Sequence, residues 1–423
     1  MQFQSRRRGS RAVGWHVGLT DGAVLGRGQA AESLAERAAG RPVVVFCDTE
    51  PWECFLQFGA ALRRRGIRVE RLTRTERSAT QRLNDALQRP VFSRTTAVFD
   101  AEGNSLPATL QAVLPRTVVA VEAVEDVAAA LPLSAAGVLP AVRTSDERLS
   151  PLLFDKFGMT DHARQHGLRV PRTWDAPPGV DALPLMLKPR LGAGGREIEL
   201  ISDPAGYDRA SRRAQARPGH YLWQEVAPGE LLHVGGVARE GALVQAACYR
   251  SVGSPHSPLG PSSEVIVVDD PETMAQAEGL MASLGYTGAF CLDYVRDGDG
   301  RALLIDVNAR VFGSWKALQD AGLDMVGAYL HAIGLTTTAP RGRARVGMTI
   351  RVLPHNLLFD GTKPVGPVLR ARLTSVLAAS GDLGARWATA AALRLLAAGL
   401  LELGRRRPRP AVADRRRTAV PRG

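Results

Sequence analysis

The first part of the chain alternates short apolar runs with segments whose apolar residues have helical spacing. Arg41–Cys47 reads RPVVVFC, a β-branched run typical of a buried parallel strand. Pro51–Arg65 has helical spacing and is ended by Gly66. Alternation of this kind predicts a small doubly wound α/β domain over residues 41–150. Its further strands are expected at Ile67–Leu72, Thr96–Asp100 and Thr117–Glu122.

From about residue 150 the pattern changes to hairpins of longer strands mixed with helices. One hairpin turns at Arg239–Gly241, and the last turns at DGDG, Asp297–Gly300, a strong turn signal. Antiparallel hairpins beside helices predict a second, α+β unit over residues 151–338. Its expected helices are Leu152–His166 and Pro271–Leu284, and its expected strands include Leu185–Lys188, Tyr221–Ala227, Ala289–Val295 and Ala302–Asn308.

Two peripheral regions flank these units. Residues 1–40 are predicted to form a basic flexible segment, and residues 339–423 a C-terminal extension. Ala385–Leu403 is the most apolar late segment, but it contains Arg386, Arg394 and Glu402. Those charges argue against a spanning helix and favour a packed or surface-lying amphipathic one.

The net charge of +12 over 423 residues suggests a nucleic-acid partner until the charges are located. Residues 1–12 and 405–423 together hold eleven of these twelve net charges, so the body of the chain is nearly neutral. Basic ends of this kind are usually solvated tails. Weak attraction to an anionic membrane or to nucleic acid is the alternative, and no specific nucleic-acid site is predicted.

The four cysteines form no CxxC pair and have no histidine cluster beside them in the sequence. Buried free thiols in a reducing compartment are therefore expected. The N-terminal segment contains no apolar run of signal-peptide length. The expected location is the cytoplasm, with peripheral contact at a membrane left open. The cysteines are Cys47, Cys54, Cys248 and Cys291.

The last hairpin carries the most informative polar residues. A turn centred between Gly298 and Asp299 would pair Asp293 with Leu304, which puts Asp293 on the face of Asp306 and Asn308. Two carboxylates on one face of an apolar sheet repel each other, and a divalent cation removes that repulsion. Oxygen ligands of this kind suit Mg²⁺. The alternative is three polar residues on a solvated face.

Other candidate residues for a phosphate ligand lie on both sides of this hairpin in the sequence. Arg310 continues the strand alternation and could neutralise charge on a phosphoryl group. Lys188 ends a strand before a glycine loop whose N–H groups could contact phosphates. That loop contains Gly192, Gly194 and Gly195, and it fits neither GxxxxGK[ST] nor GxGxxG. A further strand exit offers groups for an adenine and a ribose: Gln224, Glu225, Val226 and Glu230.

The order of these pieces resembles the ATP-grasp superfamily over Asp155–Gly334. The matching segments read DKFGMTDHARQHGLRVPRTW, MLKPRLGAGGREI, WQEVAPGE and GYTGAFCLDYVRDGDGRALLIDVNARVFGS. The end of the last one, with the AGLD that follows, is similar to the carbamoyl-phosphate-synthase-like branch. Family members usually have Glu in place of Asp306, and in that branch Pro in place of Ala309.

The resemblance implies an ATP-grasp fold and a set of roles. Lys156 and Lys188 would contact ATP phosphates beneath the glycine loop, and Arg310 would meet the γ-phosphate. Gln224, Glu225 and Val226 would lie at the adenine and Glu230 at the ribose. Asp293, Asp306 and Asn308 would hold one or two Mg²⁺, with Mn²⁺ as an alternative ion.

The implied activity is that of a carboxylate–amine ligase. A carboxylate attacks the γ-phosphorus, ADP leaves, and an amine displaces phosphate from the acyl phosphate to form a C–N bond. Arg250 is the first candidate for holding the acceptor carboxylate, and Ser314 the second. Two alternatives stay open: an ATP-binding regulatory protein without catalysis, and a membrane or nucleic-acid surface binder that uses the Arg-rich ends. The fold does not select the carboxylate or the amine.

Overall fold

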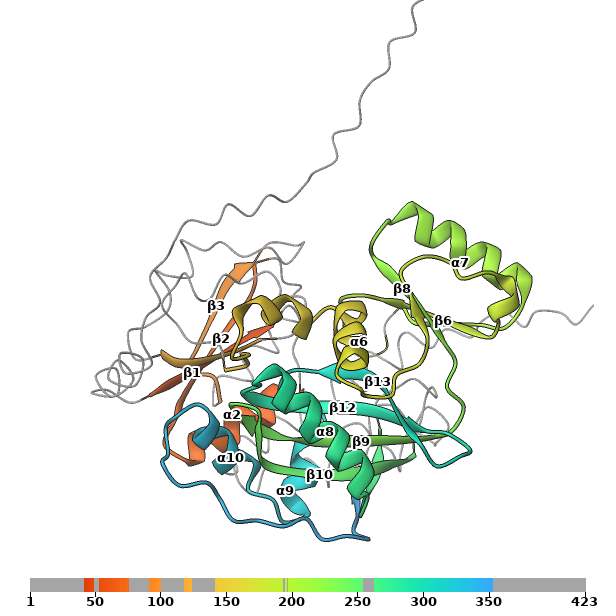
Figure 1. The fold of residues 1–423 in the computed structure, drawn as a ribbon. Helices are drawn as coiled ribbons and strands as arrows, with labels where there is room; N and C mark the ends of the chain where they lie inside the picture. Colours follow the sequence, from red (N-terminus) through yellow and green to blue (C-terminus); the bar gives the residue numbers. More distant parts are fainter. Residues whose placement is uncertain are drawn as a thin grey trace, which may run out of the picture.

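The computed structural model describes residues 42–48, 53–75, 91–99, 118–123, 141–192, 195, 197–253 and 262–352. These residues form three sheets with helices on their faces (Figure 1). The mixture of parallel and antiparallel sheets confirms the predicted α/β and α+β fold class. The Arg-rich ends and the segment at 385–403 lie outside the described residues. Among the described helices, none is long and apolar enough to cross a membrane.

The N-terminal unit is a parallel sheet in the order β3-β2-β1-β4. Helix α2, Glu53–Arg64, packs on it through Phe55, whose ring lies 4.9 Å from that of Phe46. On α2, Phe58 instead meets the rings of Trp315 and Tyr329 at 4.8 and 5.0 Å, which joins this unit to the rest of the protein. The strands are β1 Val43–Asp48, β2 Arg68–Arg74, β3 Arg94–Phe99 and β4 Val118–Ala123, close to the predicted ones.

A small antiparallel sheet follows, in the order β5-β8-β6-β7. Helix α7, Pro204–Ala216, covers it (Figure 1). This helix was not predicted, although its start has a readable signal: the Asp203 side chain accepts the Gly206 N–H at 2.7 Å, with Pro204 next to it. The strands are β5 Thr173–Trp174, β6 Leu185–Pro189, β7 Glu199–Ile201 and β8 Tyr221–Glu225.

The large sheet is antiparallel, in the order β13-β12-β9-β10-β11-β14. Helix α8, Pro271–Leu284, packs on one face, and α9, Trp315–Asp320, and α10, Met325–Ala332, pack on the other. Helices on both faces bury most of the sheet, so polar side chains on it are exceptions that need a reason. The strands are β9 Glu230–Arg239, β10 Ala242–Gly253, β11 Glu264–Val268, β12 Gly288–Arg296, β13 Ala302–Asn308 and β14 Thr349–Arg351.

Helix α6, Lys156–Gln165, lies between the small sheet and β13 (Figure 1). The predicted start at Leu152 is wrong, because a 3₁₀ segment, Glu147–Leu153, precedes the helix. The Asp155 carboxylate accepts the Phe157 N–H at 3.1 Å and caps the first turn. The cap sets Lys156 as the first helical residue, where its side chain can reach the strands beside it.

The predicted register of the β12–β13 hairpin is also wrong. Asp293 lies opposite Asp306, and Tyr294 lies opposite Leu304, so Ile305 has no partner on β12. Two local causes explain the shift. The turn is longer than expected, since Asp297 donates its N–H to the Arg301 carbonyl at 2.9 Å. A β-bulge at Ile305 then adds one more residue to β13.

Candidate functional site

Three polar side chains lie on one face at the β12–β13 pair. Directly opposite residues of an antiparallel ladder share a face, so Asp293 faces the same way as Asp306, and Cys291 the same way as Asn308. The amide of Asn308 donates to Oδ2 of Asp293 at 3.3 Å. The side chains of Asp293 and Asp306 are 23% and 24% exposed, so a ligand can reach them.

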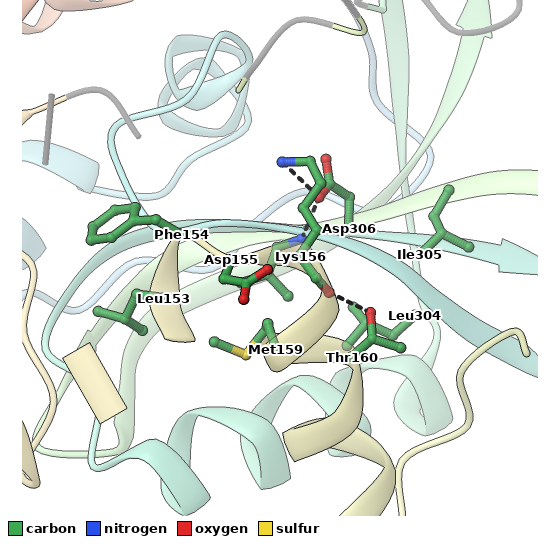
Figure 2. Close-up of a pocket in the computed structure, with 10 residues that line it drawn as sticks. Leu153, Phe154, Asp155, Lys156, Met159, Thr160, Leu304, Ile305 and Asp306 are labelled. Carbon is green, nitrogen blue, oxygen red and sulfur yellow. Dashed lines mark hydrogen bonds and ion pairs between the residues drawn. The ribbon is translucent and has the colours of Figure 1, made fainter. Parts of the chain in front are cut away.

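Lys156 reaches this face from the head of α6. Its Nζ lies 3.5 Å from Oδ1 of Asp306 and donates to the Gly192 carbonyl at 2.8 Å. Figure 2 shows the ammonium beside the Asp306 carboxylate, on the side away from Met159. The lysine therefore joins the carboxylate strand to the glycine loop. Gly192 and Gly195 have positive φ angles, while Gly194 lies outside the described residues.

Lys188 approaches from the small sheet. The residue is 7% exposed, and its Nζ donates to the Gln224 side-chain oxygen at 2.7 Å and to the Ile305 carbonyl at 3.3 Å. Burial lowers the pKa of Lys188, and the charge of Asp306 opposes that effect. Gln224 is itself held by a hydrogen bond from its Nε2 to Thr173 Oγ1 at 3.1 Å. The buried Lys188 ammonium thus contacts both the small sheet, through Gln224, and the large sheet, through Ile305.

Arg310 is 5% exposed and lies next to the same strand end. Its Nη2 donates to Asn308 Oδ1 at 3.1 Å. The following residue, Val311, donates its N–H to Glu122 on β4 at 2.7 Å, and Tyr329 donates to the other Glu122 oxygen at 3.2 Å. Burial raises the pKa of Glu122 to about 7, while the hydrogen bonds and Arg310 oppose the shift. Glu122 is a supporting residue that the sequence prediction missed.

His233 is a second residue that was missed. It lies opposite Asp293 on the neighbouring strand β9, and its Nδ1 is 2.7 Å from Asp293 Oδ1. The imidazole stacks on Tyr249 with the ring centres 5.1 Å apart, and the Tyr249 hydroxyl lies 2.6 Å from Ser314 Oγ. Ser314, the second candidate for the acceptor, therefore lies on the same face as the carboxylates. Only the pairing of β9 with β12 could have revealed His233.

The structure does not bring Arg250 to this face. Tyr249 lies opposite His233, and Arg250 lies opposite Leu232, so Arg250 points to the other side of the sheet. There it donates to Glu230 at 3.0 Å, and both side chains are exposed. These two residues are thus brought together, but away from Asp293 and Asp306. The predicted role of Arg250 in holding the acceptor does not fit this position.

The remaining adenine candidates lie where the small sheet ends. Glu225 accepts the backbone N–H of Arg172 at 3.0 Å, and Val226 follows in the connection to β9. Both residues are half-buried. They are close in sequence to Gln224, which contacts Lys188 directly. Of the groups predicted for the nucleotide, Gln224, Glu225 and Val226 thus follow one another at this strand exit, whereas Glu230 pairs with Arg250 on the other side of the large sheet.

The arrangement combines negative oxygens with surrounding cations. Asp293, Asp306 and Asn308 offer oxygen donors at a partly exposed sheet face, a donor set that fits Mg²⁺. Lys156, Lys188 and Arg310 approach that face from three different elements. Such a site can hold a polyphosphate through a metal ion and neutralise charge that develops on it.

Comparison with known proteins agrees with this geometry. The family model of the ATP-grasp domain matches residues 153–314. Comparison of the sequence with curated proteins finds no match. One similar solved structure is N5-carboxyaminoimidazole synthetase from Staphylococcus aureus, with TM-score 0.55, 14% identity and coverage of 71% of this chain and 78% of that one.

Two more solved structures have the same fold. Carboxyaminoimidazole ribonucleotide synthase from Aspergillus clavatus, complexed with ATP, has TM-score 0.57 and 17% identity, covering 72% of this chain and 80% of that one. L-amino acid ligase from Bacillus licheniformis has TM-score 0.55 and 16% identity, covering 74% and 79%. At these low identities, the structural likeness shows the fold alone. The resemblance read from the four sequence segments is confirmed, and the chain carries an ATP-grasp domain over residues 153–314.

Proposed function

We propose that the protein is an ATP- and Mg²⁺-dependent ligase that joins a carboxylate to an amine. The observation that supports this most is the pairing of Asp293 with Asp306 on one sheet face, with Lys156 3.5 Å from the second carboxylate. Oxygen donors for a metal and a cation for phosphate occur together there. The named activities of the similar structures, which include an amino acid ligase, agree with this proposal.

The residues would divide the work of the reaction as follows. Asp293, Asp306 and Asn308 would hold Mg²⁺, which supplies charge neutralisation on the triphosphate when it is bound. Lys156 and Lys188 would bind and orient the phosphates. Arg310 would stabilise charge on the γ-phosphoryl oxygens while the carboxylate oxygen attacks phosphorus and the bond to ADP breaks. An amine would then displace phosphate and form the C–N bond.

Positioning by these charged groups is enough for such a reaction, because ATP is already the activated reagent. The four cysteines are buried and form no disulfide, as expected, and none is needed as a nucleophile in this scheme. Ser314, whose hydroxyl lies 2.6 Å from that of the buried Tyr249 on the carboxylate face, is the residue that we propose for contact with an acceptor. Arg250 is not, since it lies on the other side of the sheet.

The test is phosphate release from Mg-ATP by the full chain. Amino acids and other carboxylates are supplied singly, with and without a panel of amines, and products are identified by mass. Release that requires both a carboxylate and an amine, together with an amide product, is the expected result. ATP binding without release for any pair would favour a non-catalytic regulatory protein instead.

A further inference from the structure

The two oxygens of the Asp293 carboxylate face different chemical groups. Oδ2 accepts the Asn308 amide at 3.3 Å, on the side of the predicted magnesium ligands. Oδ1 lies 2.7 Å from Nδ1 of His233 and 3.6 Å from Sγ of Cys291. One oxygen therefore belongs to a set of oxygen donors, and the other belongs to a set that contains nitrogen and sulfur.

The nitrogen and sulfur set has the composition of a transition-metal site. The donor atoms of His233, Cys291 and Asp293 all lie within 4.8 Å of one another. Imidazole and thiolate ligands select borderline ions such as Zn²⁺ and Co²⁺, whereas Mg²⁺ prefers oxygen. The Sγ–Oδ1 separation of 3.6 Å matches two ligands of a tetrahedral ion with bonds of about 2.3 and about 2.1 Å, while the 2.7 Å between Nδ1 and Oδ1 has to widen to about 3.4 Å when an ion enters.

Neighbouring side chains hold these donors in place. The other ring nitrogen of His233, Nε2, lies 3.4 Å from Ser262 Oγ, and the ring stacks on Tyr249. A partner at Nε2 leaves Nδ1 for a cation, as in many metal-bound histidines. The Tyr249 hydroxyl lies 3.3 Å from Cys291 Sγ, where it can donate to a thiolate. His233 and Cys291 thus have their own surrounding contacts, separate from the oxygen set.

We propose that His233, Cys291 and Asp293 bind a divalent transition-metal ion of the Zn²⁺ or Co²⁺ class. Asp293 then bridges two positions, with this ion on its Oδ1 side and the magnesium of the proposed function on its Oδ2 side. Only the magnesium position rests on the proposed function. Binding converts the Cys291 thiol to a thiolate and releases its proton to solvent. Coordination positions not filled by the protein are open to water or a substrate group.

The test is a Co²⁺ titration of the full chain without nucleotide, followed by absorption. We expect the visible bands of tetrahedral Co²⁺ and a near-ultraviolet thiolate-to-cobalt band. Added Zn²⁺ should displace Co²⁺ and remove both bands, whereas excess Mg²⁺ should leave both bands unchanged. Absence of these bands in the unmutated protein would overturn the proposal without any variant being made. If His233 and Asp293 share only a hydrogen bond and bind no metal ion, these bands should not appear.

Variants assign the ligands. Cys291→Ser should remove the near-ultraviolet band, and His233→Ala should raise the Kd for Co²⁺ by at least about tenfold. The matched control is Cys248→Ser, a buried thiol in the core on the opposite face of the same sheet, which should keep both bands. Circular dichroism checks that each variant is folded. A near-ultraviolet band lost in Cys248→Ser but retained in Cys291→Ser would refute the assignment.

The two proposals can fail separately. Phosphate release from Mg-ATP is measured without added transition metal, and Co²⁺ absorption is measured without ATP. A cobalt spectrum with no ligase activity removes only the proposed function. Ligase activity with no cobalt spectrum removes only the transition-metal site of His233, Cys291 and Asp293.

Discussion

The Glu122 carboxylate accepts the backbone N–H of Val311 at 2.7 Å, across 189 positions of the chain. Glu122 belongs to the N-terminal sheet, and Val311 follows Arg310, the residue proposed to meet the γ-phosphate. A carboxylate from one unit therefore fixes the backbone of the other next to the candidate site. Because Glu122 is fully buried, its ionised form is costly, and that cost makes a pH-dependent prediction.

The first prediction concerns stability and pH. Burial raises the pKa of Glu122 from 4.5 to about 7 in the folded protein. A carboxyl group with a higher pKa in the folded protein stabilises the fold at pH values below its unfolded pKa. This stabilisation is lost as the pH rises through its folded pKa. Relative to Glu122→Gln, the unmutated protein should therefore lose about 3 kcal/mol of unfolding free energy between about pH 4.5 and about pH 7.

Urea unfolding of both proteins at pH 5 and pH 8 measures this difference. The groups that act on Glu122 in the fold are Val311, Tyr329 and Arg310, so only the substituted carboxyl changes between the two proteins. A stability difference that is the same at both pH values would show that Glu122 keeps an ordinary pKa.

The second prediction concerns the metal ligands. Asp306→Asn removes one negative oxygen from the predicted magnesium site while conserving shape, and kcat should fall by at least about 100-fold. Steady-state phosphate release over a range of Mg²⁺ concentrations measures the effect. The control is Asp299→Asn, whose side chain is 72% exposed at the tip of the same hairpin and should leave kcat unchanged. Full activity of Asp306→Asn would remove this residue from the site.

The third prediction concerns Lys188. Lys188→Met keeps the length of the side chain but removes the ammonium that contacts Gln224 and Ile305. The KM for ATP should rise by at least about tenfold, equivalent to about 1.4 kcal/mol for a lost charged contact. Lys316→Met is the control, because Lys316 pairs with Asp320 within α9. Equal KM values for both variants would contradict the assignment.

The fourth prediction concerns Arg250, which sequence reasoning placed at the acceptor. Its side chain lies on the opposite face from His233 and pairs with Glu230 at 3.0 Å. Arg250→Ala should therefore change kcat/KM for the carboxylate by less than about twofold, as is usual for exposed positions. The assay is the same phosphate release with varied carboxylate. A tenfold rise in the KM for the carboxylate would restore the acceptor role.

Local patterns predicted the elements well, and pairings between distant strands were the main source of error. The run at 43–48 and the helix ended by Gly66 each depend on a few adjacent residues, so they could be read directly. The face of Arg250 depends on the pairing of β9 with β10, which no short segment encodes. Glu122 and His233 were missed for the same reason, because their partners lie 189 and 60 positions away. The unpredicted α7 is different, since Asp203 and Pro204 did mark its start.

The unpaired Ile305 has a consequence for how the length of this hairpin can vary. Without the bulge, Leu304 and Asp306 would point to the same face of the sheet; with it, Leu304 packs in the core with α8, and Asp306 lies on the face of Asp293 and His233. Losing the bulge would force a choice between a buried carboxylate and a leucine turned outward. Insertions and deletions among relatives should therefore be rare in the paired strands and occur mainly at the turn, Asp297–Gly300. No buried side chain there depends on the alternation of residues between the two faces of the sheet.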